Sequence, residues 1–342
     1  MKLNLKQFKT KPLNDLNDSK LIEKIKELEE IDYSKLSSPD LPFFHHGYVH
    51  TFGVIRDSLR WQWRKQLVAG ILAGIFIGVA YVAVVFATAS IDNVSVKKLL
   101  TGTLFSGVIL LIAFLGGGFL TAYFWMNKLL FTKGERWKIY LKACGLVYLG
   151  NILGIGIFSA LLLLSKTFGQ AQIQMIQDSL IYGKMYGLGD QLKSGGLSNI
   201  TISIVFKALG FVFASAILCN FLVCLAAQGA KSTKGNVVAS MIMNLLVIFY
   251  FSLAGYQHTV ANWFGAWFAL LGPISGTGFT LDVNAGWLFI VINIIPAFFG
   301  NWLGATIMTW FIAIFNKEFE VLLIKKYRLQ DLKMEFDNRQ NS

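Results

Sequence analysis

One histidine stands alone in the long apolar part of this chain. His258 lies in the segment Tyr256-Gln257-His258-Thr259-Val260-Ala261-Asn262 and is the only histidine between residues 66 and 315. The acidic residues of that stretch all fall in short polar gaps between apolar runs. They are Asp92, Glu135, Asp178, Asp190 and Asp282. An imidazole held in hydrocarbon without a carboxylate partner is costly, so it marks a candidate functional site. Its chemistry would be proton exchange near neutral pH.

The composition indicates a membrane protein. Of the 342 residues, 55% are hydrophobic and 15% are charged. Several apolar runs exceed the ~18–20 residues with which a helix crosses a bilayer. The net charge is +12. The basic residues do not form a patch that would bind nucleic acid, because they cluster beside the apolar runs, where they meet anionic headgroups. The odd number of cysteines, all in apolar runs, argues against a disulfide framework. The expected partner is the lipid bilayer, and no nucleic acid.

Six apolar runs predict six membrane-spanning helices, so the expected fold class is an all-α membrane protein. The runs cover residues 66–90, 104–131, 137–165, 199–229, 236–270 and 286–315. Basic residues gather before the first run, between the second and third, between the fourth and fifth, and after the sixth. They are Arg56, Arg60, Arg64, Lys65, Lys133, Arg136, Lys138, Lys231, Lys234, Lys317, Lys325, Lys326 and Arg328. The positive-inside rule then predicts that both termini lie in the cytoplasm.

The chain divides into three parts. Residues 1–60 form a polar extension that lacks the apolar core of a signal peptide and is expected in the cytosol, with an amphipathic helix at residues 19–31. Residues 61–316 hold the six spans, and residues 317–342 form a basic tail expected in the cytosol. We interpret the extension as an accessory collar. Its three histidines have no cysteine or acidic cluster at ligand spacing, so no metal site is expected. They are His45, His46 and His50.

Two of the predicted spans contain segments that weaken a helix. The second span holds Gly116-Gly117-Gly118, and the fifth holds Gly255 just ahead of His258. Three consecutive glycines destabilise a helix. Non-helical backbone at membrane depth is tolerated only where it is buried in protein or lines a cavity. We therefore expect spans 2 and 5 to be broken. Each is the second span of a three-span half, which is where inverted-repeat transporters place their binding site.

A repeated motif relates the two halves. Tyr148-Leu149-Gly150-Asn151-Ile152-Leu153-Gly154 in span 3 matches Phe298-Phe299-Gly300-Asn301-Trp302-Leu303-Gly304 in span 6. Because each half has three spans, the second half enters the membrane from the opposite side, and the repeat is inverted. We expect each asparagine to hydrogen-bond the freed backbone of the broken span in its own half.

The motifs, taken together, resemble the formate–nitrite transporter family over roughly residues 60–315. The resemblance rests on four segments in order: Gly150 to Gly154, Ile217 to Ala226, His258 to Asn262, and Ile295 to Asn301. It implies an aquaporin-like fold, a homopentamer with one pore per protomer, and a place in the plasma membrane. It also implies that the substrates are small monovalent anions such as formate, nitrite, lactate, acetate or hydrosulfide. No cofactor and no enzymatic reaction are implied.

The resemblance also suggests roles for particular residues. His258 matches the central pore histidine, and Thr121 matches the threonine that faces it from the loop interrupting span 2. Asn220 and Asn301 match the asparagines that pair with these elements, and Lys207 is the candidate for the family's vestibule lysine. The family builds two apolar constrictions around its central chamber. Their positions in this chain are Phe105, Ile109, Phe119, Leu120 and Phe251.

The chain departs from the family pattern at three places. Gly118 stands where the family usually has an acidic residue at the start of the span 2 loop, and Gln257 stands where it usually has glutamate before the histidine. Lys207 lies about one helical turn nearer Asn220 than the usual vestibule lysine. Without the acidic neighbours the site is less negative, which favours anion entry and disfavours a charged imidazolium.

The expected mechanism avoids moving a bare anion through an apolar constriction, which would cost many kcal/mol of lost hydration. A weak acid avoids this cost by crossing in its neutral form. Lys207 and the positive ends of half-helices would attract the anion. His258 would donate a proton or stabilise the anion, with Thr121 as second partner. Both a channel for the acid and a proton-coupled symporter fit these residues.

Other function classes make different demands on the sequence. An aquaporin or glycerol facilitator, the main alternative, would carry two Asn-Pro-Ala motifs, and the chain has none. An intramembrane enzyme would need a nucleophile–base pair, a carboxylate dyad or metal ligands at depth. A structural or sensor protein would use the fold without transport. Without a role in transport, His258 would be a neutral histidine whose hydrogen bonds go to an asparagine or to the backbone. Lys207 would then be a lysine that reaches the membrane interface.

Overall fold

The computed structural model describes residues 17–132, 134–282 and 284–340, and all its regular elements in these ranges are helices. Six helical segments of the described chain are long and apolar enough to cross a membrane, which matches the number expected. They are α3 (Trp63–Thr88), α4 with α5 (Val94–Ser106 and Val108–Leu115), α8 (Trp137–Leu164), α11 (Ile202–Ser232), α12 (Val237–Ala254), and α14 with α15 (Ala285–Phe289 and Ile295–Phe315). Lys133, one of the basic residues used above for orientation, lies outside the described residues.

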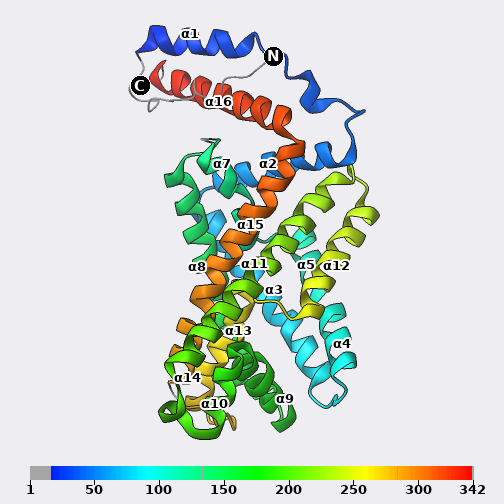
Figure 1. Cartoon of the computed structure of the whole chain (residues 1–342). Coiled ribbons are helices and arrows are strands. Elements are labelled where there is room, and N and C mark those ends of the chain that lie inside the picture. The colour runs from blue at the N-terminus through cyan, green and yellow to red at the C-terminus, as the bar shows by residue number, and fades with distance from the viewer. Residues whose placement is uncertain (1–16, 133, 283, 341–342) are drawn as a thin grey trace.

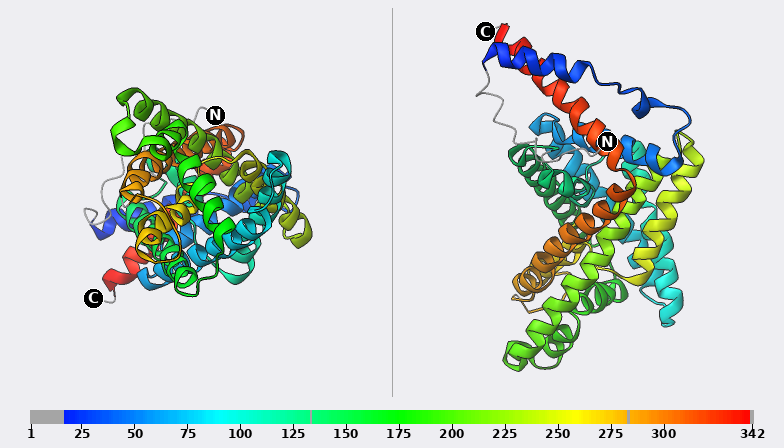
Figure 2. Two further views of the ribbon diagram at one scale, coloured as in Figure 1. Left: turned by 90° about the horizontal axis from the view of Figure 1, so that it is seen from below. Right: turned by 45° about the horizontal axis from the view of Figure 1, so that its top comes forward.

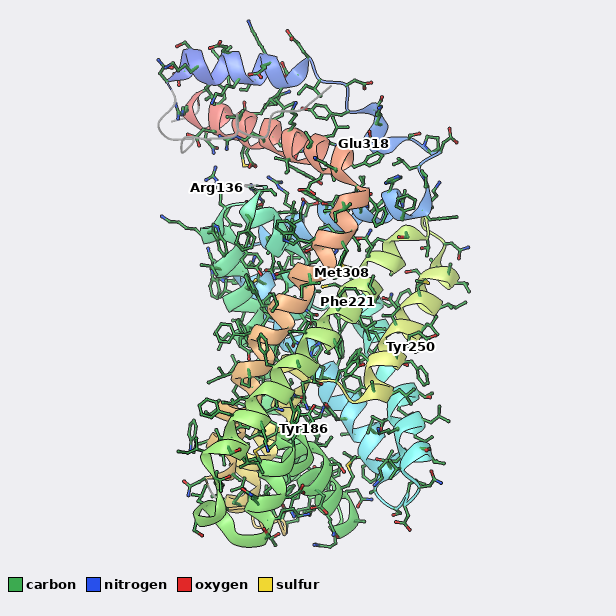
Figure 3. All side chains as sticks on the ribbon, viewed as in Figure 1. Arg136, Tyr186, Phe221, Tyr250, Met308 and Glu318 are labelled. Atoms are coloured by element: carbon green, nitrogen blue, oxygen red, sulfur yellow. The ribbon has the colours of Figure 1, made fainter. Side chains whose placement is uncertain are left out.

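The spanning helices pair in the same way in both halves of the chain. In the first half α3 packs along α8, and in the second half α11 packs along α15, while α4 packs against α12 between the halves (Figure 1). Figure 2 shows the spanning helices gathered into one bundle when seen along its long direction. Side chains fill the space between the ribbons, for example around the fully buried Met308 (Figure 3).

The outer face of the bundle is apolar. On α8 a row of leucines and one isoleucine recurs every three or four residues and is exposed, while the opposite face of the same helix is buried. The exposed row comprises Leu149, Leu153, Ile157, Leu161 and Leu164. Water would disfavour a continuous apolar stripe of this size. The stripe is compatible with a lipid or protein neighbour along this helix.

The second span stops being helical part-way along. Helix α5 ends at Leu115, and Gly116 follows with a φ of +84°, a backbone conformation that favours glycine. Residues 116–119 are not helical, and the chain turns back into a helix at α6 (Leu120–Tyr123), which leads through a 3₁₀ turn to α7 (Asn127–Phe131). The non-helical segment lies where the sequence places the three glycines.

The fifth span is interrupted in a similar way. Helix α12 ends at Ala254, and Gly255 adopts a left-handed φ of +74°. A second helix, α13 (Thr259–Leu271), begins after His258, which is its N-cap. The apolar run at 236–270 therefore corresponds to two helices joined by a short extended segment that ends in the histidine.

Asn151 on α8 binds the non-helical segment of the second span. Its side-chain amide donates to the Gly118 carbonyl at 2.8 Å and to the Gly70 carbonyl of α3 at 2.9 Å. Its side-chain oxygen accepts from the Leu120 N–H at 3.2 Å. Buried backbone groups that lose helical partners need others. Asn151 supplies two such bonds, to Gly118 and Leu120, and is fully buried.

Asn301 on α15 does the same for the fifth span. Its amide donates to the Gln257 carbonyl at 2.9 Å and to the Ala216 carbonyl of α11 at 2.8 Å. Its oxygen accepts from the Thr259 N–H at 2.8 Å. The hydrogen bonds that the repeated motif predicts for the two asparagines are thus present, and they hold the two chain breaks in place.

The connection between the third and fourth spans is more ordered than the sequence suggests. Its polar composition gives no regular pattern, yet it contains α9 (Gln170–Met175), a π-helical segment (Ile176–Tyr182) and α10 (Gly187–Gly195). A short turn, Gly183–Met185, joins the last two. This folded connection covers the end of the bundle opposite the described termini (Figure 1).

Three helices outside the bundle form a collar, defined here as α1 (Asp18–Glu29), α2 (Phe43–Leu59) and α16 (Lys317–Gln340). The expected amphipathic helix at 19–31 is present as α1, and it lies beside α16 through a small apolar cluster (Figure 1). That cluster consists of Leu21, Ile25, Leu28, Leu332 and Phe336. The basic tail is thus one long helix. Residues 1–16 of the extension lie outside the described residues.

Candidate functional site

The two chain breaks bring His258 and Thr121 together. The imidazole Nε2 lies 3.0 Å from the Thr121 hydroxyl, and both side chains are buried. Thr121 belongs to α6, which restarts the second span, and His258 caps α13, which restarts the fifth. The pairing that the resemblance implied between these two residues is therefore a hydrogen bond between the two halves.

The hydrogen bonds of His258 define its tautomer. Nδ1 accepts the Ala261 N–H at 3.1 Å, as expected for a helix N-cap. In the neutral ring the proton then resides on Nε2, which donates to the Thr121 hydroxyl. That hydroxyl makes no other hydrogen bond in the described part of the chain, so its own hydrogen is free for a ligand. A second proton on the ring would have to displace the Ala261 N–H.

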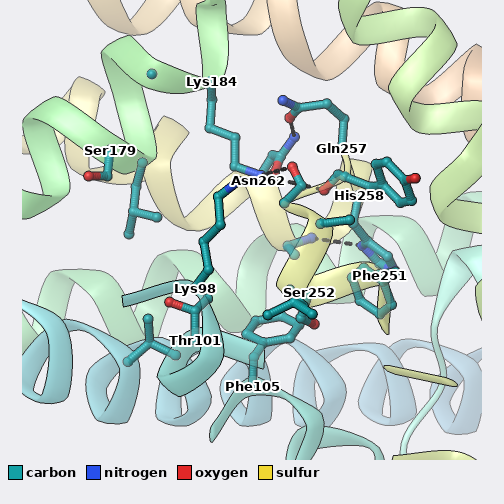
Figure 4. A pocket seen from close by; sticks show the side chains of 18 of the residues that line it. Lys98, Thr101, Phe105, Ser179, Lys184, Phe251, Ser252, Gln257, His258 and Asn262 are labelled. Carbon is teal, nitrogen blue, oxygen red and sulfur yellow. Dashed lines mark hydrogen bonds between the residues drawn. The ribbon is translucent and has the colours of Figure 1, made fainter. Parts of the chain in front are cut away.

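An open cavity of about 340 Å³ leads to this pair. Lys97 and Lys98 of α4 and Lys184 of the 183–185 turn line it, together with Gln257, His258 and other polar and apolar groups (Figure 4). None of the described residues that line it is acidic. The cavity therefore has a positive lining, which suits an anion.

A second, much smaller chamber of about 20 Å³ lies on the other side of His258. Apart from the histidine its lining is apolar. It consists of Ile77, Phe105, Val108, Ile109, Phe119, Val223, Ile248, Phe251 and His258. Phe105, Phe251 and His258 line both spaces and so separate them.

Aromatic contacts hold this partition. The Phe105 and Phe251 rings meet edge to face with centroids 6.2 Å apart, and Phe251 stacks on the imidazole at 5.9 Å. Phe119 approaches the same imidazole edge-on at 5.9 Å. The two apolar rings against the imidazole make an unpaired charge at this point expensive.

Asn220 of α11 forms hydrogen bonds with the backbone of both halves of the chain. Its amide donates to the Thr121 carbonyl at 3.2 Å and to the Asn301 carbonyl at 2.8 Å. Asn220 and Asn301 are buried and line neither cavity, so they hold the backbone that carries the pair. Leu120 is also fully buried and lines neither space.

A comparison with known proteins fits these features. A sequence model of the formate/nitrite transporter family matches residues 50–315, most of the chain. The chain belongs to the formate/nitrite transporter family. Relatives in Bacillus subtilis include the transporters YrhG, 33% identical over 147 residues (40% of this chain, 49% of YrhG), and YwcJ, 27% identical over 159 residues (46% and 54%). The matched part thus spans about half the length of these two relatives. The nitrite transporter NirC of Escherichia coli is 25% identical over 210 residues (58% and 68%).

Solved structures in the family share the fold. A pentameric formate channel with formate bound has a TM-score of 0.58 at 24% identity, and covers 74% of this chain and 97% of its own. An ion channel of the family has a TM-score of 0.59 at 19% identity, covering 78% and 95%. The six-span bundle is therefore the fold of formate/nitrite transporters.

Lys207, expected at the vestibule of a formate/nitrite transporter, lies elsewhere. It is exposed on α11 and is not among the residues that line either cavity. The helical period explains the difference, because the buried face of α11 passes through Ala208 and Val212. Lys207 is next to that face and points away from it, as its exposed neighbour Phe206 does.

Lys184 lines the open cavity instead. Its ammonium lies 3.4 Å from the Gly255 carbonyl and 3.5 Å from the Tyr256 carbonyl, where α12 ends. The negative end of a helix dipole favours a cation there. Burial lowers the pKa of Lys184 to about 8. The sequence offers one weak signal for this residue: it is the only lysine between residues 167 and 192.

Gln257 is part of a buried amide cluster. Its side-chain oxygen accepts from Asn262 at 2.8 Å and from Asn293 at 3.0 Å, and Asn262 also donates to the Asn293 oxygen at 2.7 Å. Asn293 donates in turn to the Lys184 carbonyl at 2.8 Å. The family's usual glutamate is thus replaced here by an uncharged network that fixes the 183–185 turn beside the histidine.

Proposed function

We propose that this chain forms a membrane pathway for small monovalent anions of weak acids, with formate and nitrite as first candidates and lactate as a further one. One observation carries the proposal. The His258–Thr121 pair stands between an acid-free cavity lined by lysines and an apolar chamber too small for a hydrated ion. The names of the relatives, a nitrite transporter and a formate channel, support the same class of substrate.

Anion capture begins at the open cavity. Lys184 supplies positive charge near the carbonyl end of α12, and the positive end of the α13 dipole lies at His258, which also lines the cavity. The anion loses part of its hydration here and gains hydrogen bonds from ammonium and amide groups. A partly desolvated carboxylate binds a proton more readily than in bulk water.

Passage through the aromatic partition requires loss of the charge. With Nε2 holding its proton toward Thr121, the threonine hydroxyl is free to donate to a substrate oxygen. When a hydronium ion from the cavity gives the ring a second proton at Nδ1 and displaces the Ala261 N–H, one proton can move from Nε2 through the Thr121 hydroxyl to the substrate. The substrate is then a neutral acid, and the ring is neutral again. Phe105 and Phe251 exclude the hydrated ion and admit the acid.

The wider arrangement follows from the same interpretation. The two halves are inverted repeats on an aquaporin-like plan, with spans 2 and 5 broken, and five copies assemble with one pore each in the plasma membrane. Basic residues near α2 and α16 favour a cytoplasmic position of the collar and both termini. The lysine-lined cavity then opens to the outside, and the physiological partners are the anion, protons and lipid.

The test is uptake of labelled formate, nitrite and lactate into proteoliposomes over a range of external pH. We expect wild-type uptake to rise on acidification. Removing the titratable ring by His258→Asn, or the hydroxyl by Thr121→Val, should lower it roughly tenfold or more, which corresponds to the ~1.4 kcal/mol of one buried hydrogen bond. His50→Asn, in the collar, is the matched histidine control. Uptake no faster than in empty vesicles would refute transport, and a wild-type rate in both site variants would refute the role of the pair.

A further inference from the structure

The cavity carries more positive charge than one vestibule lysine supplies. Lys98 on α4 and Lys184 on the 183–185 turn extend toward each other from opposite sides of the cavity (Figure 4). Lys97, also on α4, lines the same space. Like charges that face each other repel, so such an arrangement is stabilised when an anion lies between them.

No carboxylate in the described chain offsets this charge within the cavity. The acidic residue nearest in sequence to the lining, Asp178, pairs with Lys193 at 2.5 Å, and neither of these two lines the cavity. Asp92 precedes α4 and does not line the cavity either. The described residues contain no ion pair for Lys98 or Lys184. Lys184 makes only two long contacts to carbonyls, so both ammonium groups retain donors for a ligand.

We infer that Lys98 and Lys184 form a two-cation capture site that binds one anion between them, and that this site also binds a divalent oxyanion of the sulfate class. The inference rests on the proposed function, and it adds Lys98 as the residue that sets affinity at the mouth. A divalent oxyanion occupies the site as a blocker. One proton from the His258–Thr121 pair leaves it charged, so it does not pass the aromatic partition.

The two volumes support this distinction. A cavity needs ~10–15 Å³ of such volume to hold one water molecule. The outer cavity of about 340 Å³ has room for a tetrahedral oxyanion with water, and the chamber of about 20 Å³ beyond Phe105 and Phe251 does not. A weak-acid substrate and a divalent blocker therefore share the first site and differ at the second.

The first experiment measures formate uptake into proteoliposomes against formate concentration, with and without external sodium sulfate. Sodium gluconate at equal ionic strength is the salt control. We expect sulfate to inhibit competitively. Lys98→Gln should raise KM roughly tenfold, leave the maximal rate unchanged and remove sulfate inhibition, and Lys98→Arg should restore both. The matched control is Lys166→Gln, a substitution of a lysine exposed at the end of α8 and outside this cavity.

The second experiment is independent of transport. Sulfate that binds the folded protein raises its melting temperature in detergent. We expect this shift in wild type and Lys166→Gln, and its loss in Lys98→Gln and Lys184→Gln. A shift that depends on Lys98 supports the two-cation site even if no substrate crosses, in which case only the proposed transport fails. A wild-type KM, wild-type sulfate inhibition and wild-type shift in Lys98→Gln would overturn the inference.

Discussion

At the scale of single residues, the ammonium group of Lys184 is placed by the break in the fifth span. Helix α12 ends early, so the Gly255 and Tyr256 carbonyls lie free of helical partners, and the lysine approaches both at 3.4 and 3.5 Å. The amide cluster around Gln257 holds the backbone of the same lysine through Asn293. The feature that exposes His258 to the cavity thus also fixes the cation in front of it.

This placement gives anion capture a defined pH dependence. Burial lowers the pKa of Lys184 from 10.5 to about 8, so the side chain is charged below pH 8 and neutral above it, where a free lysine would still be charged. We expect KM for the anion to rise as external pH passes 8, by up to roughly tenfold per pH unit once the neutral form dominates.

The measurement compares wild type with Lys184→Arg between pH 6 and pH 10, with the internal pH held constant. Arginine keeps its charge over this range. Both proteins face the same supply of protons, so the ratio of their KM values isolates the lysine. The ratio should be flat below pH 8 and grow above it. Identical profiles for the two proteins would show that the charge of Lys184 does not contribute to capture.

The sequence predicts some site residues better than others, for a physical reason. An ionisable residue alone in an apolar run is visible in the sequence, so His258 can be singled out. Its contact with Thr121 follows from the family's arrangement of the two breaks. Whether a lysine of the polar connection after α8 reaches the cavity depends on how that connection folds. Its sequence has no regular pattern, so Lys207 is the candidate that the sequence offers, and Lys184 is found only in the structure.

At the scale of helices, the repeated Gly-Asn-x-Leu-Gly motif sets how closely the long helices approach. A Cβ added at Gly154 of α8 would lie 2.1 Å from the Ile71 carbonyl of α3, and one at Gly304 of α15 would lie 2.2 Å from the Ile217 carbonyl of α11. Each glycine follows the asparagine of its motif by three residues. Close backbone approach therefore brings Asn151 and Asn301 within reach of the chain breaks.

We expect Gly154→Ala to disturb both the helix pair and the break that Asn151 holds. The clash is with backbone, which cannot move aside as a side chain would, so the helices must separate, at a cost of about 1–3 kcal/mol. Melting temperature in detergent and the yield of assembled protein on size exclusion should both fall. Gly145→Ala on the same helix is the matched control, because its added Cβ meets nothing within 4 Å. Equal stability of the two variants would contradict this account of the motif.

The hydrophobic pattern predicts the number of spans better than it predicts where each helix begins and ends. The six spans are recovered because burial in lipid demands length and apolarity. The second span begins at Val94 and not at residue 104. Its first helix, α4, includes Lys97 and Lys98, which line the cavity, where charge is tolerated. The helical connection between α8 and α11 was not predicted, since its stability comes from packing on the bundle and not from its own composition.

At the scale of the whole molecule, four charged side chains fasten the collar to the bundle. Arg60 of α2 binds Glu135 at 2.9 Å and Asp331 of α16 at 2.8 Å, and Arg56 binds Asp331 at 2.8 Å. Glu135 lies between α7 and α8, and its side chain is fully buried. Arg60 lies 75 positions from Glu135 and 271 positions from Asp331, so no local pattern in the sequence predicts the cluster. It connects the first, middle and last parts of the chain.

Glu135→Gln tests whether this cluster holds the collar in place. The amide keeps the shape of the carboxylate and removes its charge, which leaves Arg56 and Arg60 with Asp331 as their one remaining acidic partner in the cluster. Breaking a buried pair typically costs roughly 3–5 kcal/mol, so the melting temperature in detergent should fall clearly and protease should cut α16 more readily. Lys333→Gln, which removes the half-exposed pair with Glu29, is the matched control and should cost about 0–1 kcal/mol. If Glu135→Gln behaves like Lys333→Gln, the apolar contacts of α2 with α11 hold the collar by themselves, and the charge cluster is dispensable.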